Sequence, residues 1–163
     1  MGAQSFLKGL GYPVERSRPG DEAIYGIAWL ANVAQRQVAK VLKTFGLTPV
    51  KFNYLMIVKH IGNTQGLSQR EIAQRLLIDA GNVTHMLDDL EQKGWVVRHP
   101  GPDRRSHRIR ITPKGSRLLD EVWPAHKKAI ERLTEGVPEK RHRQLVGILN
   151  TWRGNLKGKM HDG

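Results

Sequence analysis

Residues 68 to 94 carry two short helical patterns in close succession, and this arrangement limits the folds that the chain can adopt. Ser68 and Glu71 have the spacing of a capping box, in which the hydroxyl accepts from a first-turn amide and the carboxylate accepts from the serine amide. A helix is therefore expected to begin at Ser68. Its apolar residues at helical spacing are Ile72, Ala73, Leu76 and Leu77. We expect the helix to end near Leu77.

A second helix is expected to follow Asp79, whose side chain can accept from an unpaired amide of the first turn. The turn between the helices then falls at about residues 77 to 80. The expected buried stripe of the second helix is Val83, Leu87 and Leu90. Gly94 suits the left-handed residue that ends many helices, and the charge of Lys93 suits the negative end of a helix.

Two extended runs come after this glycine. Residues 95–98 form the first run, and residues 107–111 alternate between polar and apolar side chains in the second. Pro100 and Pro102 lack the amide donor that a ladder needs, so the connection is expected to project as a loop. Five arginines against one aspartate make the hairpin basic: Arg98, Arg104, Arg105, Arg108 and Arg110 against Asp103. The whole pattern predicts a mainly α (α+β) fold, a winged helix-turn-helix core with a two-stranded wing.

The second helix is the element expected to read DNA bases. Its first turns hold uncharged donors and acceptors, whereas Asp88, Asp89 and Glu91 come later. An acidic rear half is compatible with insertion by the N-terminal end, because the rear can stay away from phosphates. The arginine loop suits phosphates or the minor groove. The residues expected to contact DNA are Ser68, Gln69, Asn82, Thr84, His85, Asp89, Arg104 and Arg105.

The hairpin sequence DRRSHRIRITPKG resembles the MarR family of bacterial transcription regulators. The positions that match the family pattern are Asp103, Arg105, Ile111, Thr112 and Gly115. The sequence VTHMLDDLEQKGWVVR is similar to the family's recognition helix and following strand, except that many members have Arg or Lys at His85. The resemblance extends more loosely over residues 22–157. It implies a dimer formed through the terminal helices, with two recognition helices roughly 34 Å, one DNA turn, apart.

The flanking segments are expected to surround this core with helices. Residues 1–20 have no helical period and are expected to be a flexible N-terminal arm, and residues 158–163 a tail. We expect a single domain over residues 21–157, with its winged core at about 48–112. Thr48, Pro49, Thr112 and Pro113 mark helix starts, and Pro124 is expected to bend the helix that contains it. Helices at about 21–45 and 113–157 carry more apolar residues than the core requires, which predicts a homodimer.

The composition favours a polyanionic partner and argues against other classes. The 163 residues have a net charge of +12. The absence of cysteine excludes disulfides and thiol-based sensing. The sequence has no apolar run of membrane-spanning length and no signal peptide, so a cytoplasmic protein is expected. It also has no HxxxH or HExxH spacing and no catalytic motif. We therefore expect no enzyme activity, no metal site and no cofactor.

Three aromatic residues, Trp29, Tyr54 and Trp123, are most simply core or interface residues. The resemblance implies a second role, because small aromatic or phenolic effectors of the family bind in a cleft among the first, second and fifth helices. One urate-responsive subgroup uses a Trp, an Asp and an Arg that Trp29, Asp79 and Arg105 could imitate. A helix cap and a phosphate contact would explain Asp79 and Arg105 without any ligand.

These observations together predict a homodimeric, sequence-specific DNA-binding regulator. The expected target is a pseudo-palindromic operator, and the expected activity is repression that a small aromatic or lipophilic effector releases. The alternative is a winged-helix module that binds a protein and lacks sequence-specific DNA binding. Asn82, Thr84, His85 and Arg105, which are expected to be exposed, argue against this alternative.

Overall fold

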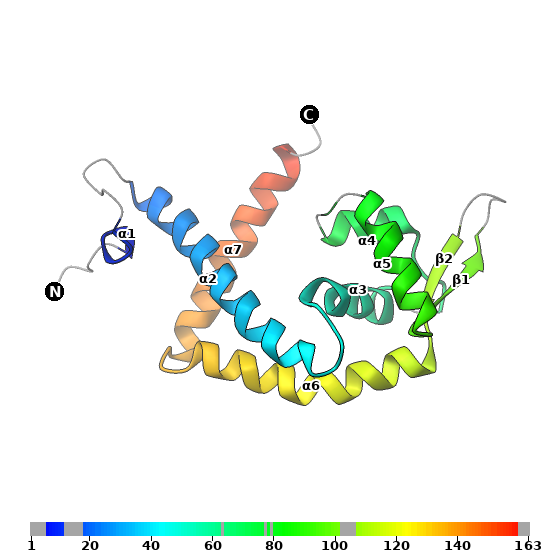
Figure 1. The fold of residues 1–163 in the computed structure, drawn as a ribbon. Coiled ribbons are helices and arrows are strands. Elements are labelled where there is room, and N and C mark those ends of the chain that lie inside the picture. Colours follow the sequence, from blue (N-terminus) through cyan, green and yellow to red (C-terminus); the bar gives the residue numbers. More distant parts are fainter. Residues whose placement is uncertain are drawn as a thin grey trace. The chain divides into compact units, whose positions relative to one another are not determined.

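The computed structural model of the chain describes residues 6–11, 18–62, 64–76, 78, 80–101 and 107–159. Helices dominate, and the strands form one antiparallel pair, so the expected mainly α class with a two-stranded wing is confirmed (Figure 1). The elements are α1 (Phe6–Gly9), α2 (Pro19–Lys43), α3 (Pro49–His60), α4 (Gln69–Leu76), α5 (Ala80–Gln92), β1 (Val96–Pro100), β2 (His107–Ile111), α6 (Pro113–Thr134) and α7 (Glu139–Lys159).

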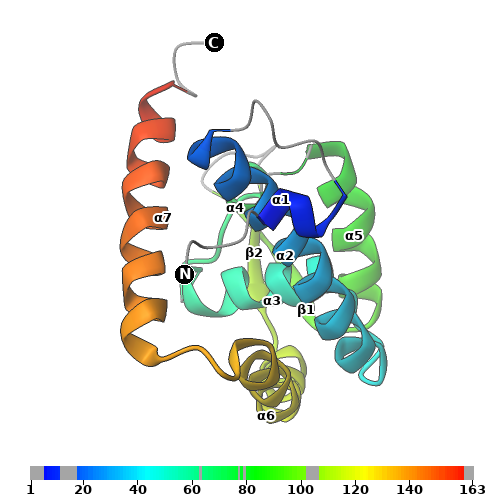
Figure 2. The same ribbon diagram turned by 90° about the vertical axis from the view of Figure 1, so that its left-hand side faces the viewer.

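The chain divides into two compact units, Met1–Ile130 and Glu131–Gly163. The second unit contains the end of α6, a turn in which Gly136 has a φ of 80°, and α7, which is one continuous helix (Figure 2). Helix α6 continues through Pro124 to Thr134. The expected single domain over residues 21–157 stays a prediction.

The core of the first unit lies where α3, α4, α5 and the sheet pack together. The expected stripe of α5, Val83, Leu87 and Leu90, is completely buried. The other buried members of this cluster are Leu42, Leu47, Phe52, Tyr54, Leu55, Val58, Leu67, Ile72, Ala73, Val96, Ile109, Leu119 and Val122. Helix α5 thus presents its apolar stripe to the core, as its spacing predicts.

The ends of the helices follow the signals in the sequence. Thr48 accepts a hydrogen bond from the amide of Lys51 at 3.3 Å, and Pro49 begins α3. Gly94 has a φ of 70°, and the amide of Trp95 donates to the carbonyl of Leu90 at 3.0 Å. This left-handed residue ends α5 and turns the chain into the wing.

The first strand differs from its expected bounds. It covers residues 96–100 instead of 95–98, because the amide of Trp95 is used by the turn that ends α5. Pro100 was expected in the loop but pairs with His107 as the last residue of β1, where it is exposed and needs no amide donor. Residues 102–106, which include Pro102, lie outside the described residues.

A second backbone pairing, which the sequence did not indicate, joins the sheet to the residues just before α4. Leu67 and Ile109 exchange two hydrogen bonds, with N–O distances of 3.0 and 2.7 Å. A single residue pair leaves no alternating pattern, so periodicity could not have predicted it. The middle of β2 is therefore fixed directly to the helix-turn-helix.

The described part of the expected flexible arm, residues 6–11 and 18–20, contains a short helix. Helix α1 lies against α2, with Leu7 buried and the amide of Phe6 donating to the Glu22 carboxylate at 2.9 Å. The Phe6 ring meets the Trp29 ring edge to face at 5.8 Å between centroids. Four residues are too few to show a helical period. Residues 1–5 and 12–17 lie outside the described part of the chain.

The junction between the wing and α6 depends on Thr112 and Gly115. The Thr112 hydroxyl accepts from the amide of Gly115 at 3.0 Å and donates to the carbonyl of Gly94 at 2.7 Å. A Cβ at Gly115 would lie 2.2 Å from the carbonyl oxygen of Trp95. Only glycine therefore permits the start of α6 to lie this close to the end of α5.

Gly115→Ala is expected to lower the free energy of unfolding by about 3 kcal/mol, the upper end of overpacking costs, because backbone and not a flexible side chain must move. Thermal denaturation followed by circular dichroism measures this loss. Gly154→Ala is the matched control, since its Cβ would meet no atom within 4 Å. The control should be neutral or stabilising by up to about 1 kcal/mol. Equal melting of Gly115→Ala and the parent would contradict the close approach.

Candidate nucleic-acid interface

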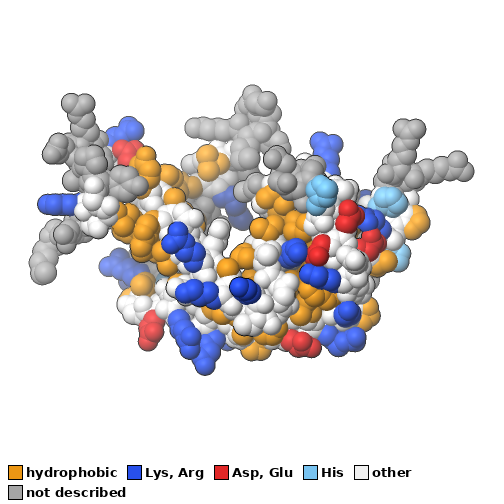
Figure 3. Space-filling view, in the orientation of Figure 1, with side chains coloured by type: hydrophobic (Ala, Val, Ile, Leu, Met, Phe, Trp, Pro, Cys, Tyr) orange, Lys and Arg blue, Asp and Glu red, His pale blue; other side chains and the backbone are white. Residues whose placement is uncertain are grey.

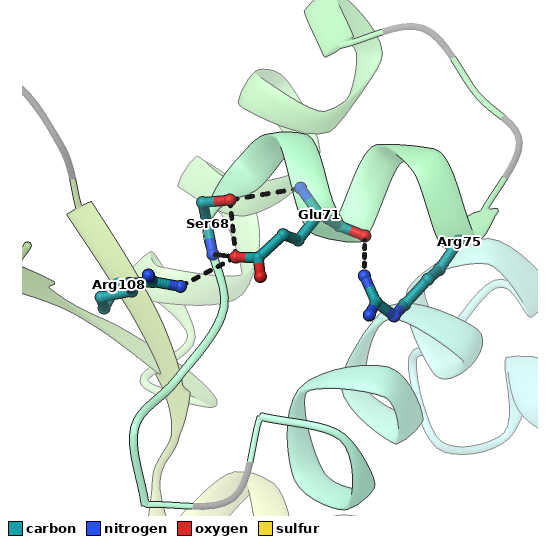
Figure 4. A network of polar contacts seen from close by, with 4 residues as sticks. All are labelled: Ser68, Glu71, Arg75 and Arg108. Carbon is teal, nitrogen blue, oxygen red and sulfur yellow. Dashed lines mark hydrogen bonds and ion pairs between the residues drawn. The ribbon is translucent and has the colours of Figure 1, made fainter. Parts of the chain in front are cut away.

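The start of α4 is joined to the wing through one carboxylate (Figure 4). Glu71 accepts from the amide and the hydroxyl of Ser68 at 2.8 and 2.7 Å, and the amide of Glu71 donates to Ser68 Oγ at 3.2 Å. The expected capping box is thus confirmed. Arg108 of β2 donates to the same Glu71 oxygen at 2.8 Å. The amide of Ser68, above all, and its hydroxyl lower the pKa of Glu71.

This arrangement gives Ser68 a structural role at the position where a DNA contact was expected. Its hydroxyl is bonded on both sides within the capping box, and its side chain is half-buried. Gln69 follows as the first residue of α4 and is also half-buried. Both remain predicted contacts from the edge of the helix-turn-helix.

The exposed face of α5 carries two of the residues expected to read bases. Thr84 and His85 are exposed, whereas Val83 and Leu87 on either side of them are buried. This is the polarity that a reading helix needs, with its apolar face in the core and donors outside. Asn82 belongs to α5, but its side chain lies outside the described residues, as do Asp79, Arg104 and Arg105.

Asp89 was expected to contact DNA, and the structure gives it different partners. Its carboxylate lies 2.7 Å from the Lys51 ammonium of α3 and 3.2 Å from that of Lys93. The hydrogen bond from Lys51 is the main cause that lowers the pKa of Asp89. An acid held between two cations joins α5 to α3, and a contact between Asp89 and DNA stays a prediction. Sequence spacing reveals the pair with Lys93 but not the one with Lys51.

Arg98 also differs from its expected place among the free charges of the wing. Its guanidinium pairs with Asp88 and with Glu91, and its amide donates to Glu91 at 3.1 Å. All three acids of the rear half of α5 are therefore neutralised by cations. In Figure 3, acidic and basic side chains lie together over α5 and the wing. Because of these pairs, the acids of α5 add little net negative charge to this surface.

The three aromatic residues proposed for an effector site are not brought together. Tyr54 is completely buried in the core, where burial raises the pKa of its phenol and the hydroxyl has no hydrogen-bond partner among the described residues. Trp29 lines a cavity of about 370 Å³ beside α1, with Leu10, Tyr25, Ala28 and Asn32. Trp123 lines a different cavity. Within one chain, the three aromatic residues therefore do not line a single cleft.

The cavity at Trp123 has a volume of about 420 Å³ and lies between α3 and α6. Its apolar wall is Met56, Leu119 and Trp123, and its polar groups are Lys59, His60 and Asp120. The Lys59 ammonium lies 2.6 Å from the Asp120 carboxylate. The volume falls within the range of small-molecule sites, and an apolar wall with a few charged groups is their usual composition.

Similarity to known proteins identifies the chain. Residues 45–106 match the model of the MarR family. The transcriptional regulator MhqR of Bacillus subtilis is 34% identical over 119 residues, which cover 72% of this chain and 80% of MhqR. The regulator YkoM of the same organism is 37% identical over 108 residues, 66% of this chain and 68% of YkoM. The chain belongs to the MarR family.

The structure agrees with this membership of the MarR family. CouR from Rhodococcus jostii, solved with p-coumaroyl-CoA, superposes with a TM-score of 0.71 and 27% identity, over 81% of this chain and 92% of CouR. The winged helix fold is thus confirmed. The relatives MhqR and YkoM are transcription regulators, the class that the sequence predicts for this chain in place of an enzyme. In the described part of the chain, no helix is long and apolar enough to cross a membrane.

Proposed function

We propose that the protein is a homodimeric repressor that recognises a pseudo-palindromic operator in cytoplasmic DNA. The observation that carries this proposal is the division of α5 into a first half that has no acidic residue and exposes Thr84 and His85, and a rear half whose acids are paired. Such a helix can enter a major groove by its N-terminal end. Membership in a family of transcriptional regulators supports the same function.

Within this proposal, each residue type has a role in recognition. Asn82 pairs with adenine through two hydrogen bonds, and the His85 imidazole donates to guanine N7 or O6. Thr84, Ser68 and Gln69 contact base edges or phosphates from α5 and α4. Arg104 and Arg105 of the wing bind phosphate or a narrow minor groove. The net charge of +12 supplies the non-specific attraction.

His85→Ala is expected to reduce the preference for the operator by about 1–3 kcal/mol, the value of one good base contact. The probes are a duplex that the parent protein selects from a random library and the unselected pool. Affinity for the pool and the melting temperature should not change, because His85 lies outside the buried stripe of α5.

Gln92→Ala is the control on the same helix, since Gln92 is exposed at its C-terminal end. It should keep the full preference. A His85→Ala protein that still prefers the selected duplex as strongly as the parent would remove His85 from the reading surface. A parent protein that selects no sequence would favour the alternative, a protein-binding module.

The dimer is proposed because one chain leaves many large apolar side chains exposed on its terminal helices. On α7 these are Leu145, Val146, Ile148, Leu149 and Leu156, and on α2 they are Ile24, Tyr25, Trp29 and Leu30. A soluble monomer rarely exposes so much apolar surface, whereas a second copy would bury it in an isologous contact.

Ile148→Glu is expected to give a monomer, because Ile148 is 52% exposed and a charge there would be desolvated at the interface. Light scattering measures the mass, and affinity for the selected duplex should fall about a hundredfold with the loss of the second half-site. Asn150→Glu adds the same charge at an exposed position two residues away and should remain dimeric. A dimeric Ile148→Glu protein would place the interface elsewhere.

We also propose that an effector releases the DNA and that it binds between α3 and α6. The Lys59 ammonium and the His60 imidazole beside Trp123 suit an aromatic anion, and CouR provides a related protein solved with an aromatic acyl-CoA. 4-Hydroxybenzoate should quench tryptophan fluorescence and weaken binding to the selected duplex, whereas the neutral 4-hydroxybenzamide should do neither. Equal responses to both compounds would exclude recognition by charge.

A further inference from the structure

We propose that Arg98 is a positioning residue for sequence recognition, which holds the wing strand β1 against α5 and does not itself bind DNA. The inference rests on the proposed function, because it concerns how the reading helix is oriented. Arg98 is one of the five arginines that make the hairpin basic, and its contacts within the protein indicate a role other than binding phosphate.

The contacts of Arg98 use both ends of its side-chain fork. One terminal nitrogen donates to Glu91 and the other to Asp88, while the backbone amide of Arg98 donates to Glu91 Oε1 at 3.1 Å. The Arg98 side chain is only 26% exposed. A planar guanidinium bonded to two carboxylates fixes both the orientation and the distance between the two elements that it joins, which a single lysine contact cannot do.

The acids that Arg98 holds lie directly behind the reading surface. Thr84, Asp88 and Glu91 are spaced by four and three residues, so they share one face of α5. His85 is three residues before Asp88. A bond to Asp88 therefore acts on the helical turn that follows Thr84 and His85, and it fixes the rotation of that turn about the helix axis.

The strand that carries Arg98 is itself anchored. Arg98 lies opposite Ile109 in the sheet, and Ile109 is completely buried and bonded to Leu67 at the start of α4. Arg98 consequently connects the exposed face of α5 to a fixed point of the core. The apolar stripe on the other face of α5 fixes the distance of the helix from the core, while Arg98 restrains its rotation about the helix axis.

A direct phosphate contact and a positioning role predict opposite effects when the acids are removed. If Arg98 bound phosphate, neutral residues at positions 88 and 91 would free its guanidinium and strengthen binding to every sequence. Removal of two negative charges from a DNA-binding surface should by itself have the same sign. A positioning role predicts weaker binding to the selected duplex alone, because α5 loses its orientation.

The test uses the full-length protein, the duplex that it selects and the unselected pool, over a series of salt concentrations. Asp88→Asn combined with Glu91→Gln is expected to lower affinity for the selected duplex about tenfold, the size of one lost base contact, while affinity for the pool is equal or higher. Glu139→Gln is the matched control, because it removes an ion-paired acid from α7. It should leave the preference unchanged.

Arg98 variants complete the test. Arg98→Gln should cause the same loss of preference for the selected duplex, and Arg98→Lys should keep part of that preference. Arg98→Gln combined with Asp88→Asn and Glu91→Gln should lose no more preference than Arg98→Gln alone, as expected for groups that act together. The salt slope for the pool should not change. Tighter binding of the double variant to both DNAs, or a slope lowered by about one in Arg98→Gln, would overturn the proposal in favour of a phosphate contact.

Two further readouts separate the possible failures. A parent protein that selects no sequence refutes the proposed function, whereas a selecting parent and an equally selective double variant refute only the role of Arg98. Circular dichroism melting accompanies each variant. If the double variant melts below the assay temperature, Glu91→Gln alone and Arg98→Lys are compared with the parent instead. Full preference of both variants for the selected duplex would then overturn the proposal.

Discussion

Cations from its surroundings neutralise the acids in the rear half of α5. Lys51 comes from α3, Lys93 from the end of α5 and Arg98 from the wing. Ion pairs with this exposure contribute about 0–1 kcal/mol each, so they do not hold the helix in the fold. Burial of Val83, Leu87 and Leu90 does that, at about 1.5–3 kcal/mol for each side chain. The pairs instead fix the orientation and the charge of a helix that the core already holds.

Local spacing in the sequence was sufficient to predict the helix ends. The capping box of Ser68 and Glu71, the threonine at position 48 and the left-handed Gly94 each depend on residues within a few positions of one another. The buried stripe of α5 follows from the same short-range geometry. These helix ends are predictable because their hydrogen-bond partners lie close together in the sequence.

Contacts between distant segments could not be predicted in this way. The pairs Lys51–Asp89 and Arg108–Glu71 join different elements, and residue type alone cannot choose among several lysines and arginines. Residue type therefore predicts a DNA contact for Asp89 and an unpaired charge for Arg98, and it does not reveal the ion pairs that both residues form. The aromatic residues show the same limit. The family resemblance implied a shared cleft, whereas their helical faces place Tyr54 in the core and Trp29 and Trp123 at separate cavities.

Helix α3 joins the two regions that the proposed function requires. Lys51 near its start pairs with Asp89 of the reading helix, and Lys59 near its end pairs with Asp120 in the cavity of α6. If an anionic ligand occupies that cavity as proposed, it would compete with Asp120 for Lys59, and its binding would act on the helix whose Lys51 pairs with α5. A ligand can shift DNA affinity only by its own difference in affinity between the two arrangements of that helix. Release of DNA by tenfold thus requires a preference of about 1.4 kcal/mol. Rearrangement of one partly exposed ion pair supplies at most about 1 kcal/mol, so apolar contacts with Met56, Leu119 and Trp123 must contribute the remainder.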